Sequence, residues 1–379
     1  MSRARGLAMK RAIPGWLQMP IYAAFRAAVA SVGVAPPVEA LRVAGKLGRA
    51  FGQARPNRAR LERAMEHIAA ARPAWSIDQR REYALRAYEH LFMLGVEMSI
   101  AERVVTRDGW PMRVEVGHLG DALRRLLGQR PVIFITGHVG NWEVLGFAMA
   151  QLGFPLCPLY RPLDLRPLDA WVRRTREAHG LHLVDKFGAV GELPALMARG
   201  GMPAFVADQN AGDRGLFVPF FGRLASTYKS IGLMAMSTGA TIVCGMARRI
   251  GVGALGADGL DEAGNAVPLT PDPRWRPGDL TPPRYRIEVL DLIEPKDWTD
   301  QPDPLFYVTA RYRRAIERMV ALAPEQFLWM HRYWKSRPRH EHAGKPLPGV
   351  LREKLRALPW MTPEELDRVE RAGVPGRAA

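Results

Sequence analysis

The chain has 379 residues, of which 47% are hydrophobic, so it can fill the core of one large or two modest domains and is not a disordered chain. Its formal net charge of +16 favours a polyanionic partner, either nucleic acid or an anionic membrane, and charge alone does not choose between them. Cys157 and Cys244 lie in apolar, strand-like stretches, which indicates buried thiols in a reducing compartment rather than a disulfide framework or a metal site.

The N-terminal end carries most of the excess charge. Residues 1–63 contain twelve Arg and Lys against two Glu, which leaves +10. Arg3, Arg5, Lys10 and Arg11 precede an apolar segment, 13–34, that contains interfacial aromatic residues. Cations beside an apolar helix favour a membrane surface over nucleic acid. Residues 1–50 are therefore predicted to anchor the protein to an anionic membrane.

Whether this segment spans the bilayer depends on two residues. Arg26 lies near its middle, and Pro20 interrupts the pattern, so a helix lying in the membrane interface is preferred to a single span. Its apolar stripe consists of Ile21, Phe25, Val29 and Val32. The alternative is that this stripe packs on the core of the protein. No small-residue cleavage site follows the segment, so a removable signal peptide is not expected.

Residues 55–105 show helical periodicity, and from residue 131 onward strand-like and helix-like segments alternate. The strands are predicted at 131–136, 154–160, 182–185, 203–207, 217–221, 241–248 and 285–293, and the helices at 141–151, 166–179, 189–199 and 229–237. This alternation predicts an α/β fold with a mixed, largely parallel sheet flanked by helices. The α/β domain is placed at 51–338, with a Gly- and Pro-rich loop insertion at 251–284 and a polar C-terminal extension at 339–379.

The strongest chemical signal is Gly137-His138-Val139-Gly140-Asn141-Trp142-Glu143, which follows the predicted strand 131–136. Reactive groups of open α/β sheets lie at such strand ends. Asn141 is a candidate N-cap, which would put Glu143 in the first helical turn. His138 can then act as a general base whose ring is oriented by Glu143. The alternative is a structural histidine in a turn.

Three other clusters are candidates for substrate binding. Arg161 ends a strand and could hold a phosphate, although a surface salt bridge is equally consistent. Asp208 and Gln209 end another strand, and the apolar stretch around Phe220 could line a hydrocarbon slot or belong to the core. The aromatic and basic segment 323–338 suits an anionic headgroup or nucleic acid.

Two apparent motifs are rejected. Gly251, Gly253 and Gly256 match a dinucleotide fingerprint, but no helical pattern follows to hold a pyrophosphate. His340 and His342 lie in a charged tail that is better explained as a solvated run than as a metal site. No metal site and no bound cofactor are therefore predicted.

Together these motifs resemble the bacterial lipid A biosynthesis acyltransferases, the lauroyl and myristoyl transferase family, within the wider H-x-x-x-x-D/E glycerolipid acyltransferase class. The resemblance covers roughly 13–338. The residues that carry it are the His138 to Glu143 motif, Tyr160-Arg161-Pro162-Leu163-Asp164, Asp208-Gln209, Phe217 to Gly222 with Thr227, and Pro324-Glu325-Gln326 through His331-Arg332 to Arg337-Pro338. The insertion at 251–284 and the extension at 339–379 depart from the family pattern.

The resemblance implies transfer of a fatty acyl chain from an acyl carrier protein or CoA thioester to a hydroxyl of a phosphorylated glycolipid, at the cytoplasmic face of the inner membrane. His138 and Glu143 would be catalytic. Backbone N–H groups at Gly140 and Asn141, or Arg161, would hold the oxyanion. The remaining substrate contacts are expected from Asp208, Gln209, Phe220, His331 and Arg332.

Three alternatives stay open. One is another glycolipid acceptor, such as a phosphatidylinositol mannoside. A second is a basic nucleic-acid-binding protein, which would leave the His138 turn unexplained; nucleic acid is not the expected partner. A third is a membrane-binding protein without catalytic activity.

Overall fold

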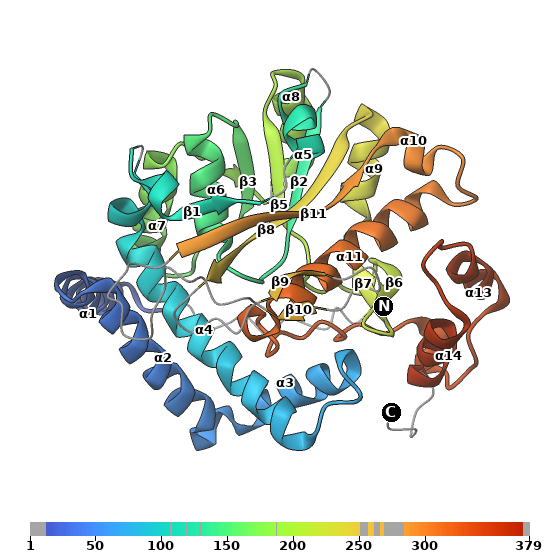
Figure 1. The fold of residues 1–379 in the computed structure, drawn as a ribbon, viewed down its shortest axis with the longest axis horizontal. Coiled ribbons are helices and arrows are strands. Elements are labelled where there is room, and N and C mark those ends of the chain that lie inside the picture. The colour runs from blue at the N-terminus through green and yellow to red at the C-terminus, as the bar shows by residue number, and fades with distance from the viewer. Residues whose placement is uncertain are drawn as a thin grey trace, which may run out of the picture.

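The computed structural model describes residues 13–373, apart from 107, 118–119, 129–130, 187, 251–256, 261–265 and 269–283. Its centre is a seven-stranded sheet with the order β1-β11-β8-β2-β5-β3-β4 (Figure 1). The strands are β1 (Val114–Val116), β2 (Val132–Thr136), β3 (Leu156–Tyr160), β4 (Val184–Asp185), β5 (Met202–Val206), β8 (Thr241–Ile250) and β11 (Arg284–Ile293). All neighbouring strands are parallel except β11 and β8, which run antiparallel. The predicted mixed, largely parallel sheet is confirmed.

Helices cover both faces of the sheet because its central strands are apolar on both sides. On β2, Ile133 and Ile135 belong to one hydrophobic cluster, which includes α9 (Lys229–Thr238) and α11 (Pro304–Leu322). Val132 and Phe134 belong to a second cluster, which includes α6 (Trp142–Gln151). Side chains of a strand alternate between faces, so a strand buried throughout must be covered twice.

The remaining elements connect or flank these layers. They are α5 (Gly120–Leu126), α7 (Arg166–Ala178), α8 (Ala189–Ala198), α10 (Pro295–Trp298), the hairpin of β6 (Leu216–Phe220) and β7 (Arg223–Thr227), and three short 3₁₀ helices, η1 (Arg55–Asn57), η2 (Trp110–Met112) and η3 (Pro324–Gln326). Cys157 and Cys244 are buried free thiols, as predicted.

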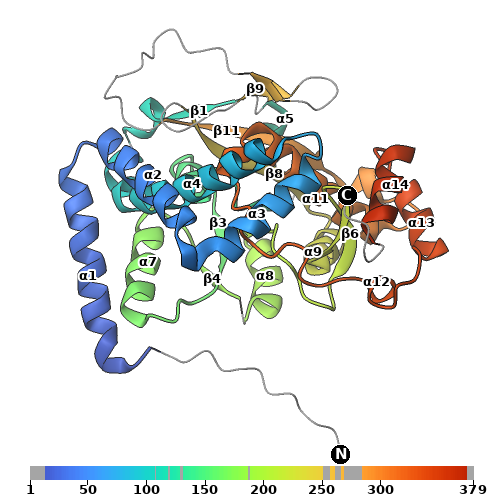
Figure 2. The same ribbon diagram turned by 90° about the horizontal axis from the view of Figure 1, so that it is seen from below.

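Four helices precede the sheet: α1 (Gly15–Val34), α2 (Pro37–Gln53), α3 (Arg58–Ala71) and α4 (Ile77–Val104). None of the residues of α1 is buried, and the helix runs without a break through Pro20, which was predicted to interrupt it. Helix α1 runs beside α7 (Figure 2). Phe25 and Arg26 contact the ring of Trp171 on α7, with the Phe25 and Trp171 ring centroids 5.5 Å apart. Helix α1 therefore lies against α7 with most of its apolar surface exposed.

By length and composition, α1 is the one helix of the described chain that could cross a membrane. Its exposed apolar side chains include Trp16, Met19, Ile21 and Phe25. Of the predicted stripe, Ile21 and Phe25 are exposed, whereas Val32 packs against a core cluster at the end of the helix. The cations predicted to flank it, at positions 3, 5, 10 and 11, lie outside the described residues.

The predicted insertion at 251–284 is described only in part. The short antiparallel strands β9 (Ala257–Leu260) and β10 (Ala266–Pro268) pair with each other. The glycines of the rejected dinucleotide motif at 251, 253 and 256 lie outside the described residues.

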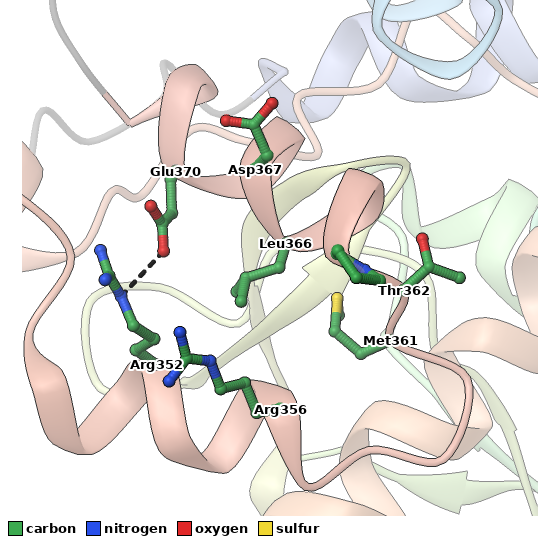
Figure 3. A pocket seen from close by; sticks show the side chains of 8 residues that line it. Arg352, Arg356, Met361, Thr362, Leu366, Asp367 and Glu370 are labelled. Atoms are coloured by element: carbon green, nitrogen blue, oxygen red, sulfur yellow. Dashed lines mark ion pairs between the residues drawn. The ribbon is translucent and has the colours of Figure 1, made fainter.

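The C-terminal extension forms α12 (Arg339–His342), α13 (Gly349–Arg356) and α14 (Pro363–Ala372), at the opposite end of the molecule from α1 in both views (Figures 1 and 2). Leu355, Leu358, Leu366 and Val369 are buried in the main core cluster. Between α13 and α14 lies an open cavity of about 350 Å³, beside the Arg352–Glu370 ion pair (Figure 3). The extension is therefore a folded part of the domain, a role that its polar composition did not predict.

Candidate active site

His138 and Asp208 meet because two parallel strands end at the same level. Strands β2 and β5 are neighbours, and their last residues, Thr136 and Val206, are paired in the register. His138 and Asp208 each lie two residues beyond these ends. Since the carboxyl ends of parallel strands share one edge of the sheet, both residues come to the same edge.

Asp208 forms hydrogen bonds to His138 through both carboxylate oxygens. The Nδ1 atom of His138 is 2.6 Å from Oδ1, and the backbone N–H of His138 donates to Oδ2 at 3.1 Å. Burial alone would raise the pKa of Asp208, but the charge and hydrogen bond of His138, together with the charge of Arg313, hold it at about 2. Because Asp208 is ionised at neutral pH, Nδ1 carries the proton and donates it, which leaves Nε2 as the acceptor.

Glu143 has a different partner from the one predicted. Its Oε2 accepts from Nε of Arg176 at 2.9 Å, and its Oε1 lies 2.5 Å from Nη2 of the same arginine. The indole N–H of Trp142 also donates to Oε1, at 3.2 Å. The prediction that Glu143 holds the His138 ring is wrong in this structure, because the guanidinium of α7 engages both Glu143 oxygens and Asp208 occupies Nδ1.

Asn141 caps α6 as predicted. Its Oδ1 accepts from the backbone N–H groups of Glu143 and Val144, at 3.1 and 2.9 Å. The turn before it depends on Gly140, whose φ of +63° is strained for other residues, and where a Cβ would collide with the Ala247 carbonyl. This turn places His138 beside Asp208, and α6 starts four residues later, at Trp142.

The predicted oxyanion role of the Gly140 and Asn141 N–H groups does not fit the structure. The N–H of Gly140 donates to the carbonyl of Gln326 at 3.0 Å, and that of Asn141 donates to the carbonyl of Ala247 at 2.7 Å. Both donors are therefore used to fix the turn, which removes them as oxyanion ligands.

A buried charge network lies beneath the turn. Arg249 on β8 forms an ion pair with Glu97 on α4, and both side chains are at most 1% exposed. Glu97 also accepts from Nδ2 of Asn141 at 2.8 Å. Nδ1 of His90 is 3.1 Å from Nη2 of Arg249, and its Nε2 is 3.1 Å from the carbonyl of Gly140. Burial and then the Arg249 charge hold the pKa of His90 well below its usual value, so this histidine is neutral.

His331 and Gln209 complete the surroundings of His138. The His331 ring centroid is 4.9 Å from that of His138, and its Nδ1 is 3.2 Å from Nε2 of Gln209. The ring of Trp142 packs edge-on to His138, also at 4.9 Å. Burial, followed by the charge of His138, lowers the pKa of His331 to about 4. His331 is thus neutral and lies close to the His138 ring; its predicted role in substrate binding stays a prediction.

The other predicted residues divide into two groups. Arg161 follows β3 at the same sheet edge, with its side chain 62% exposed and 3.9 Å from Asp164. Arg332 is also exposed, next to His331. Phe220, in contrast, is fully buried and packs on Tyr333 and Trp334, so its predicted place in an open hydrocarbon slot is not seen.

Sequence reasoning missed the residues that support the site, namely Glu97, Arg176, Arg249 and Arg313. Each comes from a helix or strand remote in sequence, and no local pattern marks it. Within the described parts of the chain, no group of three or more His, Cys, Asp or Glu side chains could hold a metal ion.

Comparison with known proteins finds relatives of this chain. The chain is 23% identical over 273 residues to the lipid A biosynthesis lauroyltransferase of Escherichia coli strain K12, an alignment that covers 70% of this chain and 76% of that one. It is 26% identical over 303 residues to the lipid A biosynthesis palmitoleoyltransferase of the same organism, with coverages of 78% and 83%.

Among solved structures, the 1-acyl-sn-glycerophosphate (LPA) acyltransferase PlsC from Thermotoga maritima aligns with a TM-score of 0.31 at 13% identity. That alignment covers 69% of this chain and 97% of that one. The model of the bacterial lipid A biosynthesis acyltransferase family matches residues 15–254, which is more than half of the chain. The protein therefore belongs to this family and is an acyltransferase.

Proposed function

We propose that this protein transfers a fatty acyl chain from an acyl carrier protein or CoA thioester to a hydroxyl group of a lipid A precursor. The observation that carries the proposal is the His138–Asp208 pair at the adjoining ends of β2 and β5. Relatives with lipid A acyltransferase names support this acceptor. An ionised, buried carboxylate behind a histidine is an arrangement that makes the far ring nitrogen a general base.

In the proposed reaction, Nε2 of His138 takes the proton of the acceptor hydroxyl while Nδ1–H stays bonded to Asp208. The oxygen attacks the thioester carbonyl carbon, and the resulting tetrahedral intermediate collapses by breaking the carbon–sulfur bond. The departing sulfur receives the proton from the imidazolium. The products are an ester of the glycolipid and the free thiol of the carrier, and the enzyme returns to its starting state.

Exposed cations at the crevice edge suit the anionic substrates. Arg161 and Arg332 are both exposed near the His138 site and can bind the acceptor's phosphate or the oxyanion. His331 is neutral, so with Gln209 it provides uncharged hydrogen-bonding groups beside the base. In this proposal the exposed arginines bind the anionic groups of the substrates, and the more buried His138 transfers the proton.

Membrane association belongs to the same proposal. Helix α1 has no buried residue, and α2 exposes Val43, Leu47 and Phe51. Exposed apolar side chains on neighbouring helices, preceded by a basic N-terminus, suit an anionic membrane surface. We place the enzyme at the cytoplasmic face of the inner membrane, where thioester donors are available.

The test is mass spectrometry of lipid A from a strain that lacks its own secondary acyltransferase. The strain carries this chain, its His138→Ala variant, or a His182→Ala control in which an exposed histidine is replaced. We expect a mass gain of one acyl group with the first and third and none with the second. A gain with His138→Ala would contradict the assigned base. Absence of any gain from membrane-bound protein would exclude this acceptor, and the glycolipid rival would then be tested next.

A further inference from the structure

Arg313 on α11 is a buried arginine immediately behind the catalytic pair. Its side chain is fully buried, and Nη1 donates to the carbonyl of Ala207 at 3.0 Å. Ala207 directly precedes Asp208, and its own N–H donates to Thr136 at 2.8 Å, continuing the β2–β5 pairing. The guanidinium lies 3.7 Å from the centroid of the Phe220 ring. Arg313 thus fixes the backbone that presents Asp208.

Arg313 makes fewer hydrogen bonds than a buried guanidinium requires. Its Nε and Nη2 atoms have no hydrogen-bond partner among the described residues. Asp208 and Glu317 attract it electrostatically, yet neither lies within ion-pair distance of it in the described chain. Burying a charge with unmade hydrogen bonds is costly, and an apolar side chain would fill the same space at less expense. Packing therefore does not explain why residue 313 is an arginine.

We propose, on the basis of the proposed function, that Arg313 is a positioning residue of the reaction. Its guanidinium holds the Ala207–Asp208 backbone and places a permanent positive charge behind the Asp208 carboxylate. That charge offsets part of the carboxylate's field at His138, and so sets the pH range in which Nε2 can accept a proton. Arg313 does not touch the reacting atoms, and it acts through Asp208.

The other titratable groups that face Asp208 do not carry a positive charge that could replace that of Arg313. Asp208 faces His331, Tyr333 and Tyr228 as well as His138 and Arg313. Burial raises the pKa values of both tyrosines, so they are neutral, and His331, with a pKa of about 4, is neutral too. Burial lowers the pKa of Arg313 from its ordinary value while Asp208 raises it, and a guanidinium stays protonated at neutral pH, so Arg313 is the cation on this side of the carboxylate.

Arg313 in turn faces Tyr312 and Glu317 on its own helix. Burial raises the pKa of Tyr312 far above neutrality, so it carries no charge. Burial also raises the pKa of Glu317 to about 7, so this carboxyl titrates within the range of an activity assay. Repeating the measurement in a Glu317→Gln background separates its titration from that of His138.

The experiment is a pH profile of kcat/KM for full-length enzyme in mixed micelles with carrier-bound donor and lipid A precursor. In Arg313→Met and Arg313→Gln the positive charge is lost, the field at His138 becomes more negative, and its protonated form is favoured. We expect the acidic limb to move to higher pH by roughly one unit. Arg313→Lys keeps the charge, so its limb should stay at the wild-type position.

The matched control is Arg311→Met. Arg311 is an arginine on the same helix that pairs with Asp291 and Asp297, away from the site. Its loss should lower stability without moving the limb. A folded Arg313→Gln or Arg313→Met enzyme with an unmoved limb would overturn the inference. So would an Arg313→Lys limb that moves as far as that of the neutral variants.

A second readout does not need activity. Diethyl pyrocarbonate modifies neutral imidazole, so its rate at His138, followed by mass spectrometry of the peptide that contains it, reports protonation directly. The pH midpoint of modification should shift upward in the neutral variants by the same amount as the kcat/KM limb. If His138→Ala retains transfer, the proposed function fails. If His138→Ala is inactive and the His138 midpoint does not move, only the role of Arg313 fails.

Discussion

Asp208 and Glu143 are both buried carboxylates beside the His138 turn, yet they serve different partners. Asp208 reaches His138 from the end of the neighbouring strand, whereas Glu143, five residues from His138, is held by Arg176 of α7. Glu143 also sits in the first turn of α6, where the helix dipole favours its charge. The difference shows that spacing in a motif does not decide which carboxylate contacts the His138 ring. The alignment of adjacent strand ends does.

The largest effect is expected from Asp208→Asn, which tests the first half of this comparison. The amide removes the negative charge and can donate to Nδ1, which favours the wrong tautomer of His138. We expect transfer to fall by about 10² to 10⁴-fold, the range for general acid–base groups, while the protein stays folded. The measurement is transfer rate with carrier-bound donor. Asp185→Asn, at the exposed end of β4, is the control and should leave the rate intact.

A third buried carboxylate, Glu97, does not contact His138; it pairs with Arg249 and accepts a hydrogen bond from Asn141. Glu97→Gln would leave the buried Arg249 without its countercharge and would weaken the bond to Asn141. Breaking one side of a buried ion pair typically costs about 3–5 kcal/mol. We expect a loss of unfolding free energy of this size in denaturant titration. A stability equal to that of the wild type would show that water or another group replaces the carboxylate.

Glu143→Gln should have a smaller effect on catalysis than Asp208→Asn. Arg176 would lose its ionic partner, which we expect to cost about 1–3 kcal/mol of stability and less than a tenfold loss of rate. Adding Arg176→Met should recover most of the stability, because the uncompensated cation is gone. Loss of transfer comparable to that of Asp208→Asn, in either variant, would return Glu143 to a direct role in the chemistry.

The smallest effect is expected from mild acid. The pKa of Asp208 is about 2, so this carboxylate keeps its charge, and its contact with His138, at any pH where the protein would be assayed. The neutral histidines respond first. Burial lowers the pKa of His67 to about 4, against 6.5 for a free histidine, despite its bond to Trp329. Between these values the unfolded chain binds more protons, so stability falls as the pH falls.

One such histidine accounts for about 2 kcal/mol by pH 5. His67→Gln, which can keep a donor toward Trp329, should flatten the loss of unfolding free energy between pH 7 and 5. The exposed His182→Gln variant should follow the wild-type curve. Equal slopes for all three proteins would mean that His67 is already protonated in the folded state.

Much of the fold was predictable because its central strands are short apolar runs separated by helical periodicity. The predicted strand at 131–136 is β2, and the predicted helix at 141–151 is α6. Helix α11 was missed because its sequence mixes cations with apolar residues, and buried arginines such as Arg313 break the expected amphipathic pattern. The folding of the extension at 339–379 was not predicted either, because its few apolar residues are widely spaced among charged ones.

The sequence marked His138 and Asp208 as candidates but did not predict that they would pair. His138 and Asp208 were both identified at strand ends, but the order of strands in the sheet is a long-range property that local patterns do not contain. Once β2 and β5 are neighbours in the observed register, the contact follows from the equal two-residue offset. The choice of Arg176 as the partner of Glu143 depends likewise on the packing of α7 beside α6.

The left-handed backbone of Gly140 has a consequence for the tolerance of this turn to change. Position 140 has no room for a side chain, while its N–H and carbonyl are bonded to Gln326 and His90. In a library that carries every amino acid at this position, selection for lipid A acylation should return glycine alone. Decayed gene copies that no longer make active enzyme would then be recognisable by a replacement here, even where His138 itself survives.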